Sequence, residues 1–425
     1  MTGERALTRS IASIVGGDHV TEGPGVKIDG VGPKLLVRPG SADEAAACMK
    51  VCSESDAAVV PAGQMTWLEC GNPLKRADVV LSLERMRRII DYSPPDLTAT
   101  VEAGLTLNGL NAVTVQERQW LPLDPPGFKR ASLGAIAACN SSGALRLGFG
   151  TPRDYLIGLK LVHADGTESK SGGKVVKNVA GYDMNKLYAG SYGTLAIITE
   201  LTFKLRPRPD RSSTILITSQ YRGPLFQLAR RVIASELQPA SVVLTRRLFE
   251  SGGSSAPDDA LLIRFNDSEA AVEHQVDWVI KAIDENCKAT LLSENEAAAV
   301  WTEVADFDPR AIRVRLSVPL SAVPAEFEKA FLAHLDCVAA ADIGTGIIRL
   351  AFDAGEGSAV DQIKRLRASA ASADGTLTIE KAPVEVRRAG DAWGDVGSTA
   401  ELLRSIKARF DPQSLLNPGK FVLGL

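Results

Sequence analysis

The chain has 425 residues, of which 48 are Lys or Arg and 51 are Asp or Glu, so its formal net charge is −3. A near-neutral chain with 5% aromatic residues has neither the broad basic surface nor the stacking platforms that nucleic-acid-binding proteins use. The length and the 45% hydrophobic content predict two or three domains with large cores.

The sequence shows no membrane-spanning or metal-binding pattern. No run of about 18 apolar residues occurs, and the first residues lack the apolar stretch of a signal peptide, so we expect a cytoplasmic protein. Six cysteines without a C-x-x-C pair indicate neither a disulfide scaffold nor a zinc ribbon or ferredoxin-type cluster. We expect no metal site, because no ligand spacing relates the four histidines, His19, His163, His274 and His334.

The N-terminal part of the chain predicts a β-α-β unit that leads into a loop of small residues. Strands are predicted at 35–39, 57–61, 78–83 and 98–102, with a short helix near 106–118. Ser41 and Glu44 form an S-x-x-E capping box for the helix between the first two strands. The second strand continues into AGQMTWLECGN, where small residues would let backbone N–H groups approach an anion. A plain surface loop is the alternative.

A segment rich in Gly, Ala, Ser and Pro follows Trp120 and cannot form a dense side-chain core by itself. Its backbone is therefore expected to pack closely against something large and flat. Strands are predicted at 155–163 and 195–205, and the second follows the turn Gly190–Gly193. Neither GxxxxGK[ST] nor G-x-G-x-x-G after a strand is present, which excludes a Walker nucleotide site and argues against a Rossmann-type nicotinamide site.

A proline-stiffened stretch at 206–211 marks a boundary, beyond which the pattern changes. Strands are predicted at 213–218, 241–245, 260–265, 311–318, 347–352 and 376–380, and helices at 224–237, 269–287, 323–335 and 360–372. This order favours an α+β domain, an antiparallel sheet with helices on one side. The tail is predicted to be a helix followed by an arm that either docks or frays.

Segment 59–205 resembles the FAD-binding domain of the vanillyl-alcohol oxidase, or PCMH-type, flavoproteins. The matching stretches are VVLSLERMRRIIDYSPPDLTATVEAGLTL, LPLDPP, SLGAIAACNSSGALRLGFGTPRDYLIGLKLVHADGT and GGKVVKNVAGYDMNKLYAGSYGTLAIITELTFKLRPRP. FDPQSLLNPGKFV resembles the arm by which this family returns to the flavin. Within the family, the likeness is greatest to the E-type subunits of glycolate oxidases, also called glycolate dehydrogenases. The resemblance implies a PCMH-type FAD-binding domain of two α+β subdomains at 1–207, an α+β cap domain with an antiparallel sheet at 208–385, and a C-terminal helix and arm at 386–425.

The resemblance also implies a set of residues that hold non-covalent FAD. Pro61, Ala62, Gly63, Gln64, Met65 and Thr66 match the pyrophosphate loop, and Ser132, Gly134, Asn140, Gly143 and Gly150 match the stretch along the ribityl chain and flavin ring. Gly193 and Ile198 match the adenine end, while Asp124 and Pro125 belong to the matching LPLDPP stretch and Asn417 and Lys420 to the arm. The alternative is that these glycines serve only turns.

The chain departs from the family pattern in two places. Gln64 and Met65 stand where the family has consecutive glycines, and a positive φ at either residue would cost about 1–2 kcal/mol and weaken FAD retention. The loop contains no histidine, so no histidyl–flavin bond is expected. Hydroxy-acid dehydrogenases of the family carry a histidine-rich metal motif in the cap, and the corresponding residues 341–349 contain none.

Oxidation of a 2-hydroxy acid needs a cation for the substrate carboxylate and a group that accepts the hydroxyl proton. Arg313, Arg315 and Arg349 are the candidate cap cations, although solvated positions would explain them equally well. No base stands out: Lys177, Tyr182 and Asp183 match positions near the expected flavin edge, and packing accounts for them as well.

The leading hypothesis is an FAD-binding subunit of a glycolate oxidase complex that converts glycolate to glyoxylate. Its partners would be a catalytic D-type flavoprotein subunit and an iron–sulfur subunit, which pass electrons to a membrane quinone pool, so membrane contact would be peripheral. One alternative is a self-sufficient FAD-dependent dehydrogenase for another 2-hydroxy acid. The other is an assembly subunit that has lost FAD.

Overall fold

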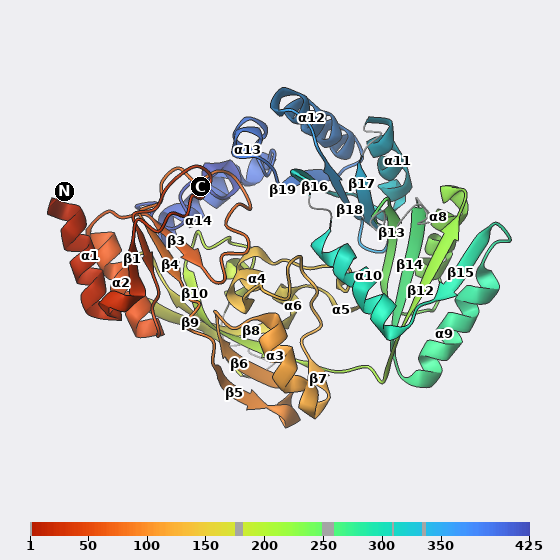
Figure 1. Cartoon of the computed structure of the whole chain (residues 1–425), viewed down its shortest axis with the longest axis horizontal. Helices are drawn as coiled ribbons and strands as arrows, with labels where there is room; N and C mark the ends of the chain where they lie inside the picture. The colour runs from red at the N-terminus through yellow and green to blue at the C-terminus, as the bar shows by residue number, and fades with distance from the viewer. Residues whose placement is uncertain (1, 175–181, 249–258, 308–309, 334–336) are drawn as a thin grey trace.

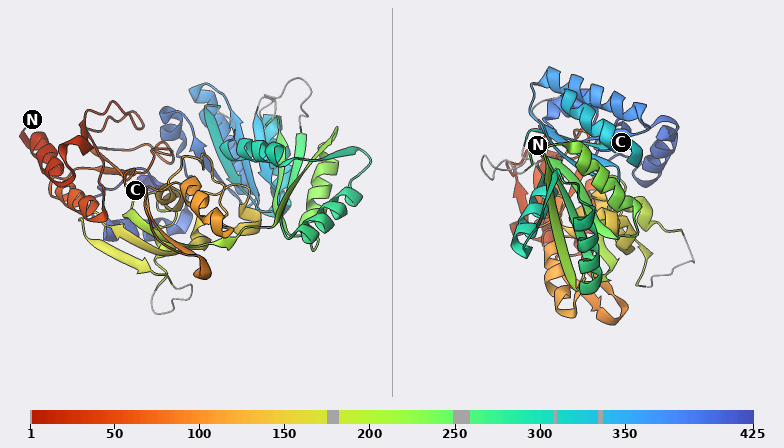
Figure 2. Two further views of the ribbon diagram at one scale, coloured as in Figure 1. Left: turned by 60° about the horizontal axis from the view of Figure 1, so that its bottom comes forward. Right: turned by 90° about the vertical axis from the view of Figure 1, so that its right-hand side faces the viewer.

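The computed structural model describes residues 2–174, 182–248, 259–307, 310–333 and 337–425. The chain forms two lobes side by side, an N-terminal lobe and a C-terminal lobe, and its last residues return to the N-terminal lobe (Figure 1). The left view in Figure 2 shows the same division. No helix among these residues is long and apolar enough to cross a membrane.

The first sheet of the N-terminal lobe contains the predicted β-α-β unit. Its strands, in spatial order, are β1 (Val20–Glu22), β2 (Leu35–Val37), β4 (Val79–Ser82) and β3 (Val59–Ala62). Both β2 and β3 run parallel to β4. Helix α2 (Ala42–Glu54) connects β2 to β3, and α1 (Thr2–Val15) packs against it. One half of the predicted capping box is present, because the Glu44 N–H donates to Ser41 Oγ at 3.1 Å; Glu44 Oε2 accepts instead from the N–H of the preceding residue, Gly40, at 2.7 Å.

The second sheet of this lobe is antiparallel. Its strands, in spatial order, are β5 (Ile89–Ser93), β6 (Thr98–Glu102), β10 (Ile197–Lys204), β8 (Leu156–Val162) and β9 (Glu168–Gly172). The helices around it are α3 (Leu107–Thr114), α4 (Leu133–Cys139), α5 (Arg146–Phe149), α6 (Pro152–Tyr155) and α7 (Asn185–Tyr188). A two-stranded ribbon pairs β7 (Gln119–Trp120) with β11 (Arg206–Pro207). One hydrophobic core joins both sheets, with Val59 and Leu201 fully buried in it.

The C-terminal lobe is built on an antiparallel sheet, as the sequence predicts, although the sheet has eight strands and the sequence predicts six of them. Its strands, in spatial order, are β15 (Cys287–Leu291), β12 (Arg211–Ser219), β14 (Asp259–Asp267), β13 (Pro239–Arg246), β17 (Val338–Asp342), β18 (Ile347–Phe352), β16 (Ile312–Ser317) and β19 (Thr376–Lys381). One face packs on α8 (Arg222–Ala234), α9 (Glu269–Ala282), α11 (Val323–Ala333) and α12 (Glu356–Ser372). The opposite face carries α10 (Glu294–Asp306), so the prediction of helices on one side only is wrong. Trp301 of α10 anchors it there by donating a hydrogen bond to Thr214 Oγ1 at 2.9 Å.

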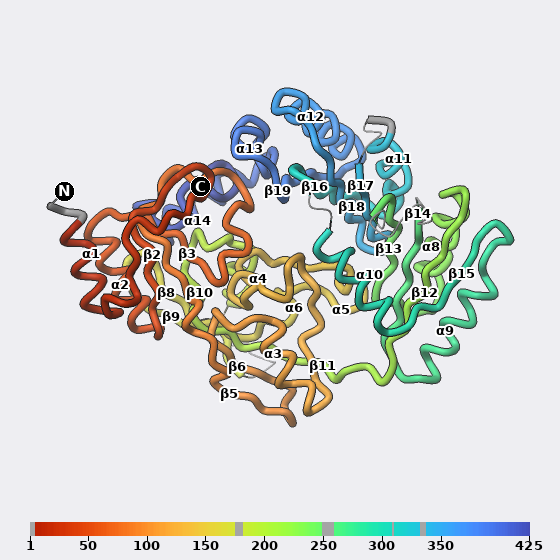
Figure 3. The backbone as a smooth tube through the Cα atoms, in the orientation of Figure 1, coloured from red at the N-terminus to blue at the C-terminus, as the bar shows by residue number. Residues whose placement is uncertain are grey.

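The C-terminal tail docks on the N-terminal lobe and does not fray. It contains α13 (Val384–Gly390), which spans the proposed boundary at residue 385, and α14 (Ala400–Phe410). The arm then runs beside β3: the Val59 N–H donates to Leu415 O at 2.8 Å and the Asn417 N–H to Val59 O at 3.0 Å. Figure 3 shows this end of the chain beside the N-terminal strands.

A buried ion cluster connects three segments that lie far apart in the sequence. Asp29, in the loop between β1 and β2, accepts hydrogen bonds from Arg387 of α13 at 2.5 Å and from Lys420 of the arm at 2.6 Å. The Leu74 N–H donates a third bond to the same carboxylate. Burial favours the neutral acid, but the two cations outweigh it, so the pKa of Asp29 is lowered. The cluster retains one net positive charge beside the first sheet.

We expect Asp29→Asn to loosen the tail, because the change leaves two buried cations without a carboxylate. Removal of one partner from a buried charge cluster costs about 3–5 kcal/mol. Denaturant unfolding followed by circular dichroism measures this loss. The matched control is Asp56→Asn, whose ion pair with Arg76 is exposed and should leave stability unchanged. Equal stability of both variants would show that the cluster does not hold the tail.

Candidate active site

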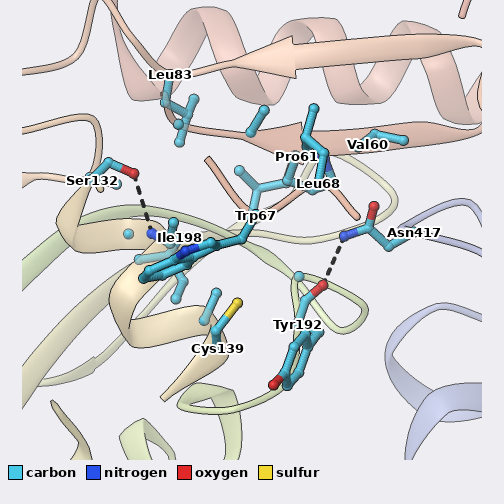
Figure 4. A pocket seen from close by; sticks show the side chains of 18 of the residues that line it. Val60, Pro61, Trp67, Leu68, Leu83, Ser132, Cys139, Tyr192, Ile198 and Asn417 are labelled. Atoms are coloured by element: carbon cyan, nitrogen blue, oxygen red, sulfur yellow. Dashed lines mark hydrogen bonds between the residues drawn. The ribbon is translucent and has the colours of Figure 1, made fainter. Parts of the chain in front are cut away.

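A cleft in the N-terminal lobe lies between the two sheets and the arm (Figure 4). It encloses about 790 Å³ of space, part of it open to solvent. Eleven of the residues predicted to hold FAD line it: Pro61, Ala62, Gly63, Met65, Thr66, Ser132, Gly134, Gly193, Ile198, Asn417 and Lys420. These come from the β3 loop, the start of α4, the turn before β10 and the arm, so the fold brings four distant segments together.

The loop after β3 offers free hydrogen-bond donors. None of the backbone N–H groups of residues 63–66 donates to another described residue. A row of unpaired amides is suited to an anion such as a pyrophosphate. The loop also lies very close to α4, because a Cβ on Gly63 would come within 1.9 Å of Ser132 Oγ. Glycine is therefore required at position 63 by lack of space.

The arm supplies an unsatisfied polar atom to the same cleft. Asn417 Nδ2 donates to Tyr192 O at 2.8 Å, whereas Asn417 Oδ1 is buried and has no partner among the described residues. A buried acceptor without a donor costs free energy, which a ligand hydroxyl or amide would recover. Lys420, held by Asp29, adds positive charge nearby. The cleft therefore fits FAD. It offers the free amides of residues 63–66, the close approach at Gly63, the unpaired Asn417 Oδ1 and the charge of Lys420.

The two departures from the family pattern differ in their consequences. Met65 has φ 55°, so the predicted strain of about 1–2 kcal/mol applies to it. Gln64 has no positive φ and lies on the outer surface beside Glu84, Arg85 and Arg87 instead of in the cleft. Met65 remains in the cleft lining. The strain is therefore confined to one residue of the loop.

The remaining predicted residues lie outside the cleft lining and have other contacts. Asp124 pairs with Arg264 of the C-terminal lobe at 3.3 Å and accepts from the Leu145 N–H at 3.1 Å. Burial nevertheless raises the pKa of Asp124. Gly143 sits against this group, since its Cβ would lie 2.0 Å from Asp124 O. The position of Asp124 indicates a contact between the lobes.

Pro125 directly follows Asp124 and is likewise absent from the cleft lining. Asn140 ends α4 in the left-handed conformation, with φ 46°, and accepts a bond from the Arg153 N–H at 3.1 Å. Gly150 ends α5 at φ 84°, where a side chain would be strained. None of these three residues lines the cleft, and their assignment to FAD remains a proposal.

A second cavity adjoins the first, between the lobes. Trp67, Cys70, Cys139 and Tyr192 line both spaces. The C-terminal lobe contributes Arg313, Arg315, Arg349 and Glu380, so we call this space the arginine cavity. The three candidate arginines thus lie together. Arg313 and Arg315 alternate with Val314, which is in the helix-side core, so both point to the opposite face, toward the N-terminal lobe.

Charge in the arginine cavity is unbalanced. Glu380 Oε2 lies 3.2 Å from Arg313 Nε and 3.3 Å from Arg349 Nε. Arg315 stands directly opposite Arg349 on the neighbouring strand, and its buried Nε has no hydrogen-bond partner among the described residues. Burial raises the pKa of Glu380, but the three arginines outweigh it and the pKa is lowered. Three cations face one carboxylate, and facing like charges favour an anionic ligand.

The weaker candidates lie elsewhere. Lys177 and His334 fall outside the described residues. Tyr182 is 96% exposed, and Asp183 pairs with Lys186 at 3.3 Å on the surface. His163 Nε2 bonds Ser169 Oγ at 2.7 Å, beyond the β8 strand. Within the described part of the chain, no group of three His, Cys, Asp or Glu side chains could hold a metal ion.

Sequence analysis missed Trp67, Tyr192 and Glu380 as site residues. Trp67 is three residues beyond Gln64 in the predicted loop, and Tyr192 lies inside the predicted Gly190–Gly193 turn, so the loops themselves were the available signal. Glu380 gave no such signal. It is the extra residue of a β-bulge opposite Arg313 and Val314, and only strand register brings it to the arginines.

Comparison with known proteins agrees with this geometry. Residues 33–172 match the family model described as FAD binding domain. Glycolate oxidase subunit GlcD of Bacillus subtilis is 29% identical over 424 residues, covering 91% of this chain and 88% of its own. Glycolate oxidase subunit GlcE of Escherichia coli is 32% identical over 188 residues, covering 44% of this chain and 50% of its own. The structure of p-cresol methylhydroxylase with substrate bound aligns with TM-score 0.77 at 15% identity, covering 99% of this chain and 97% of that one.

The chain therefore has the PCMH-type FAD-binding fold, with FAD as its cofactor. The FAD-binding domain and the similarity to glycolate oxidase subunit GlcD together identify the chain as an FAD-dependent oxidoreductase.

We expect Gly63→Ala to lower FAD affinity at least about tenfold, because the added Cβ collides with Ser132 and displaces the amide-bearing loop. FAD titration of the apoprotein, followed by flavin fluorescence, measures this affinity. Gly223→Ala on α8, where a Cβ meets nothing within 4 Å, is the control and should bind FAD normally. Normal affinity of Gly63→Ala would contradict the cradle.

Stability should fall with rising pH through a single buried acid of the C-terminal lobe. Burial raises the pKa of Asp342 to about 7, against about 3.9 in an unfolded chain. The native state thus holds this proton more tightly, and the resulting stabilisation is lost as the pH rises from about 4 through 7. Relative to Asp342→Asn, the wild-type protein should lose about 3 kcal/mol between pH 5 and pH 8. Urea unfolding at both pH values tests this, with Asp361→Asn as the exposed control.

Proposed function

We propose that this chain is the FAD-binding subunit of a glycolate oxidase complex, which oxidises a small 2-hydroxy acid, glycolate, to glyoxylate. The observation that carries the proposal is the arginine cavity beside the FAD cleft. A 2-hydroxy acid has a carboxylate next to the carbon that is oxidised. A cation-rich space that shares four lining residues with the cofactor cleft is suited to such a molecule.

Arg315 is the residue best placed to bind the carboxylate. Its guanidinium group makes no salt bridge with the described residues, and its Nε is buried and unpaired. A planar guanidinium binds a carboxylate through two parallel hydrogen bonds. Arg349 is more constrained, because it bonds Glu380 and donates to Ser142 O at 3.1 Å. Arg349 therefore maintains the shape and charge of the cavity while Arg315 binds.

The chain's own residues prepare the reaction by orientation and exclusion of water. FAD, when bound, supplies the acceptor for the two electrons that leave the substrate carbon as a hydride. Trp67 and Trp393 line the arginine cavity and keep it partly dry, which strengthens the arginine–carboxylate interaction. Glu380 is ionised, but its two arginine partners make it a weak proton acceptor.

The similarity to GlcD and GlcE supports a multi-subunit setting, since both names describe subunits. On this proposal the partners are a catalytic D-type flavoprotein subunit and an iron–sulfur subunit. The assembly is cytoplasmic and contacts the membrane only through its partners, to deliver electrons to a quinone pool.

A self-sufficient dehydrogenase for another 2-hydroxy acid is the second candidate. Two observations favour it: the arginine cavity is complete within one chain, and the similarity to GlcD extends over 91% of the chain. The strain at Met65 is the observation behind a third candidate, an assembly subunit without FAD. The free amides and the glycine cradle of the same loop oppose it.

The direct test is an absorption spectrum of the purified chain, followed by anaerobic addition of glycolate and D-lactate. Bleaching of the flavin band by the isolated chain supports the self-sufficient candidate. Bleaching that requires the D-type subunit supports the complex. If the protein takes up no FAD on reconstitution, the third candidate, an assembly subunit without FAD, is supported.

We expect Arg315→Met to raise KM for the hydroxy acid by about tenfold to a hundredfold, because a hydrogen-bonded ion pair with the carboxylate is lost. FAD content should not change, since Arg315 is outside the cleft lining. Steady-state kinetics in the fully assembled protein measure KM, with the exposed Arg230→Met on α8 as the control. An unchanged KM would show that the carboxylate binds elsewhere.

A further inference from the structure

Tyr192 is a polar side chain at the junction of the two cavities that the proposed chemistry has not used. It lies between Ser191 and Gly193 in the turn before β10 and lines both the FAD cleft and the arginine cavity. Trp67, Cys70 and Cys139 share this position. Tyr192 is the one of these four that carries a hydroxyl group, so it can both donate and accept a strong hydrogen bond.

The Tyr192 side chain is held in one orientation. Its backbone has φ 55°, its N–H donates to Ala138 O at 2.8 Å, and its carbonyl accepts from Asn417 Nδ2 at 2.8 Å. The ring packs edge-on against Trp393, with centroids 4.7 Å apart, and lies 5.9 Å from Phe421. Figure 4 shows the ring extending from the Asn417 contact away from Pro61. Non-glycine residues at positive φ persist where the surrounding structure fixes them, and they are frequent at functional sites.

The hydroxyl group at the end of this ring is free. Among the residues that the structure describes, it has no hydrogen-bond partner. Burial raises the pKa of Tyr192 well above its ordinary value; Cys139 and Cys70 act in the same direction, and Arg315 opposes them. The phenol is therefore protonated at neutral pH and acts as a donor. Arg315 and Glu380 are the charged groups of the arginine cavity that influence it.

We propose that Tyr192 Oη donates a hydrogen bond to an oxygen of the anionic substrate bound by Arg315, and so positions the reacting carbon at the junction of the arginine cavity and the FAD cleft. This inference rests on the proposed function. Arg315 supplies the charge, and Tyr192 supplies direction, because its ring is fixed by Trp393 and its backbone by Asn417. A phenol donor beside an arginine suits a small oxyanion, whose oxygens accept from both.

A purely structural role for Tyr192 makes a different prediction. If the ring only packs against Trp393 and Phe421, removing the hydroxyl group changes nothing, and only removing the ring has an effect. Tyr192→Phe keeps the ring, so it separates the two roles. Tyr221→Phe, on the 65% exposed Tyr221 of the C-terminal lobe, is the matched control.

Two measurements on the FAD-loaded protein test the inference. The first is the affinity for oxalate, a two-carbon anion that cannot be oxidised by hydride loss, followed by the change in flavin absorbance. The second is the rate of flavin reduction by glycolate or D-lactate in the assembled protein. We expect Tyr192→Phe to weaken oxalate binding and to lower kcat/KM, each by about tenfold to a hundredfold, with FAD content unchanged. The loss in kcat/KM should include kcat, because a misplaced carbon reacts slowly.

Each outcome decides one of the two proposals. Oxalate affinity equal in wild type and Tyr192→Phe overturns the role of Tyr192, as does an oxalate response that is absent from the wild-type protein. If neither hydroxy acid reduces the flavin but Tyr192→Phe still weakens oxalate binding, the proposed oxidation of a 2-hydroxy acid is wrong. The role of Tyr192 in binding an anion is then still supported. If a hydroxy acid reduces the wild-type flavin, and Tyr192→Phe changes neither the kinetics nor the oxalate affinity, the proposed oxidation is supported. In that case the Tyr192 ring has only a packing role.

Discussion

The buried carboxylate of Asp29 is the constraint on which the site depends. It lies in the first loop of the fold, yet it pairs with a cation after the C-terminal lobe and with another in the arm. A buried charge needs these partners, so the loop, α13 and the arm cannot separate without a large cost. The arm in turn presents Asn417 to the cleft and fixes the Tyr192 turn. Closing the ends of the chain on each other thus completes the cofactor site.

The sheet of the C-terminal lobe gives the site its charge. Strand alternation sends apolar residues such as Val314 and Leu350 into the helix-side core and sends Arg313, Arg315 and Arg349 toward the N-terminal lobe. The facing pair Arg315 and Arg349 is unfavourable in the unliganded chain, which is the energetic sign of a face built to meet an anion. The bulge at Glu380 relieves part of that repulsion without neutralising the cavity.

Three of the residues that line the cleft have a left-handed backbone conformation. Met65, Tyr192 and Asn417 all have positive φ and all line it, and they come from three different segments. Such strain is affordable only where packing and hydrogen bonds on both sides fix the conformation, as the Asn417–Tyr192 bond does.

The sequence by itself determined the local elements and the chemistry of the cofactor loop. Apolar periodicity, the Ser41 cap and the small-residue loops predicted the β-α-β unit and most strands, because these depend on neighbours in the chain. The eleven cleft residues came from the resemblance to a flavoprotein family. The inner strand β17, the edge strand β15 and the opposite-face helix α10 were not predicted, although the Ser293–Glu296 capping box is a local signal for α10. Only the tertiary structure decided that the three arginines share a cavity, that Glu380 joins them and that Tyr192 stands at the junction. Strand register, a bulge and the return of the arm create these contacts, and no local pattern encodes distances between segments hundreds of residues apart.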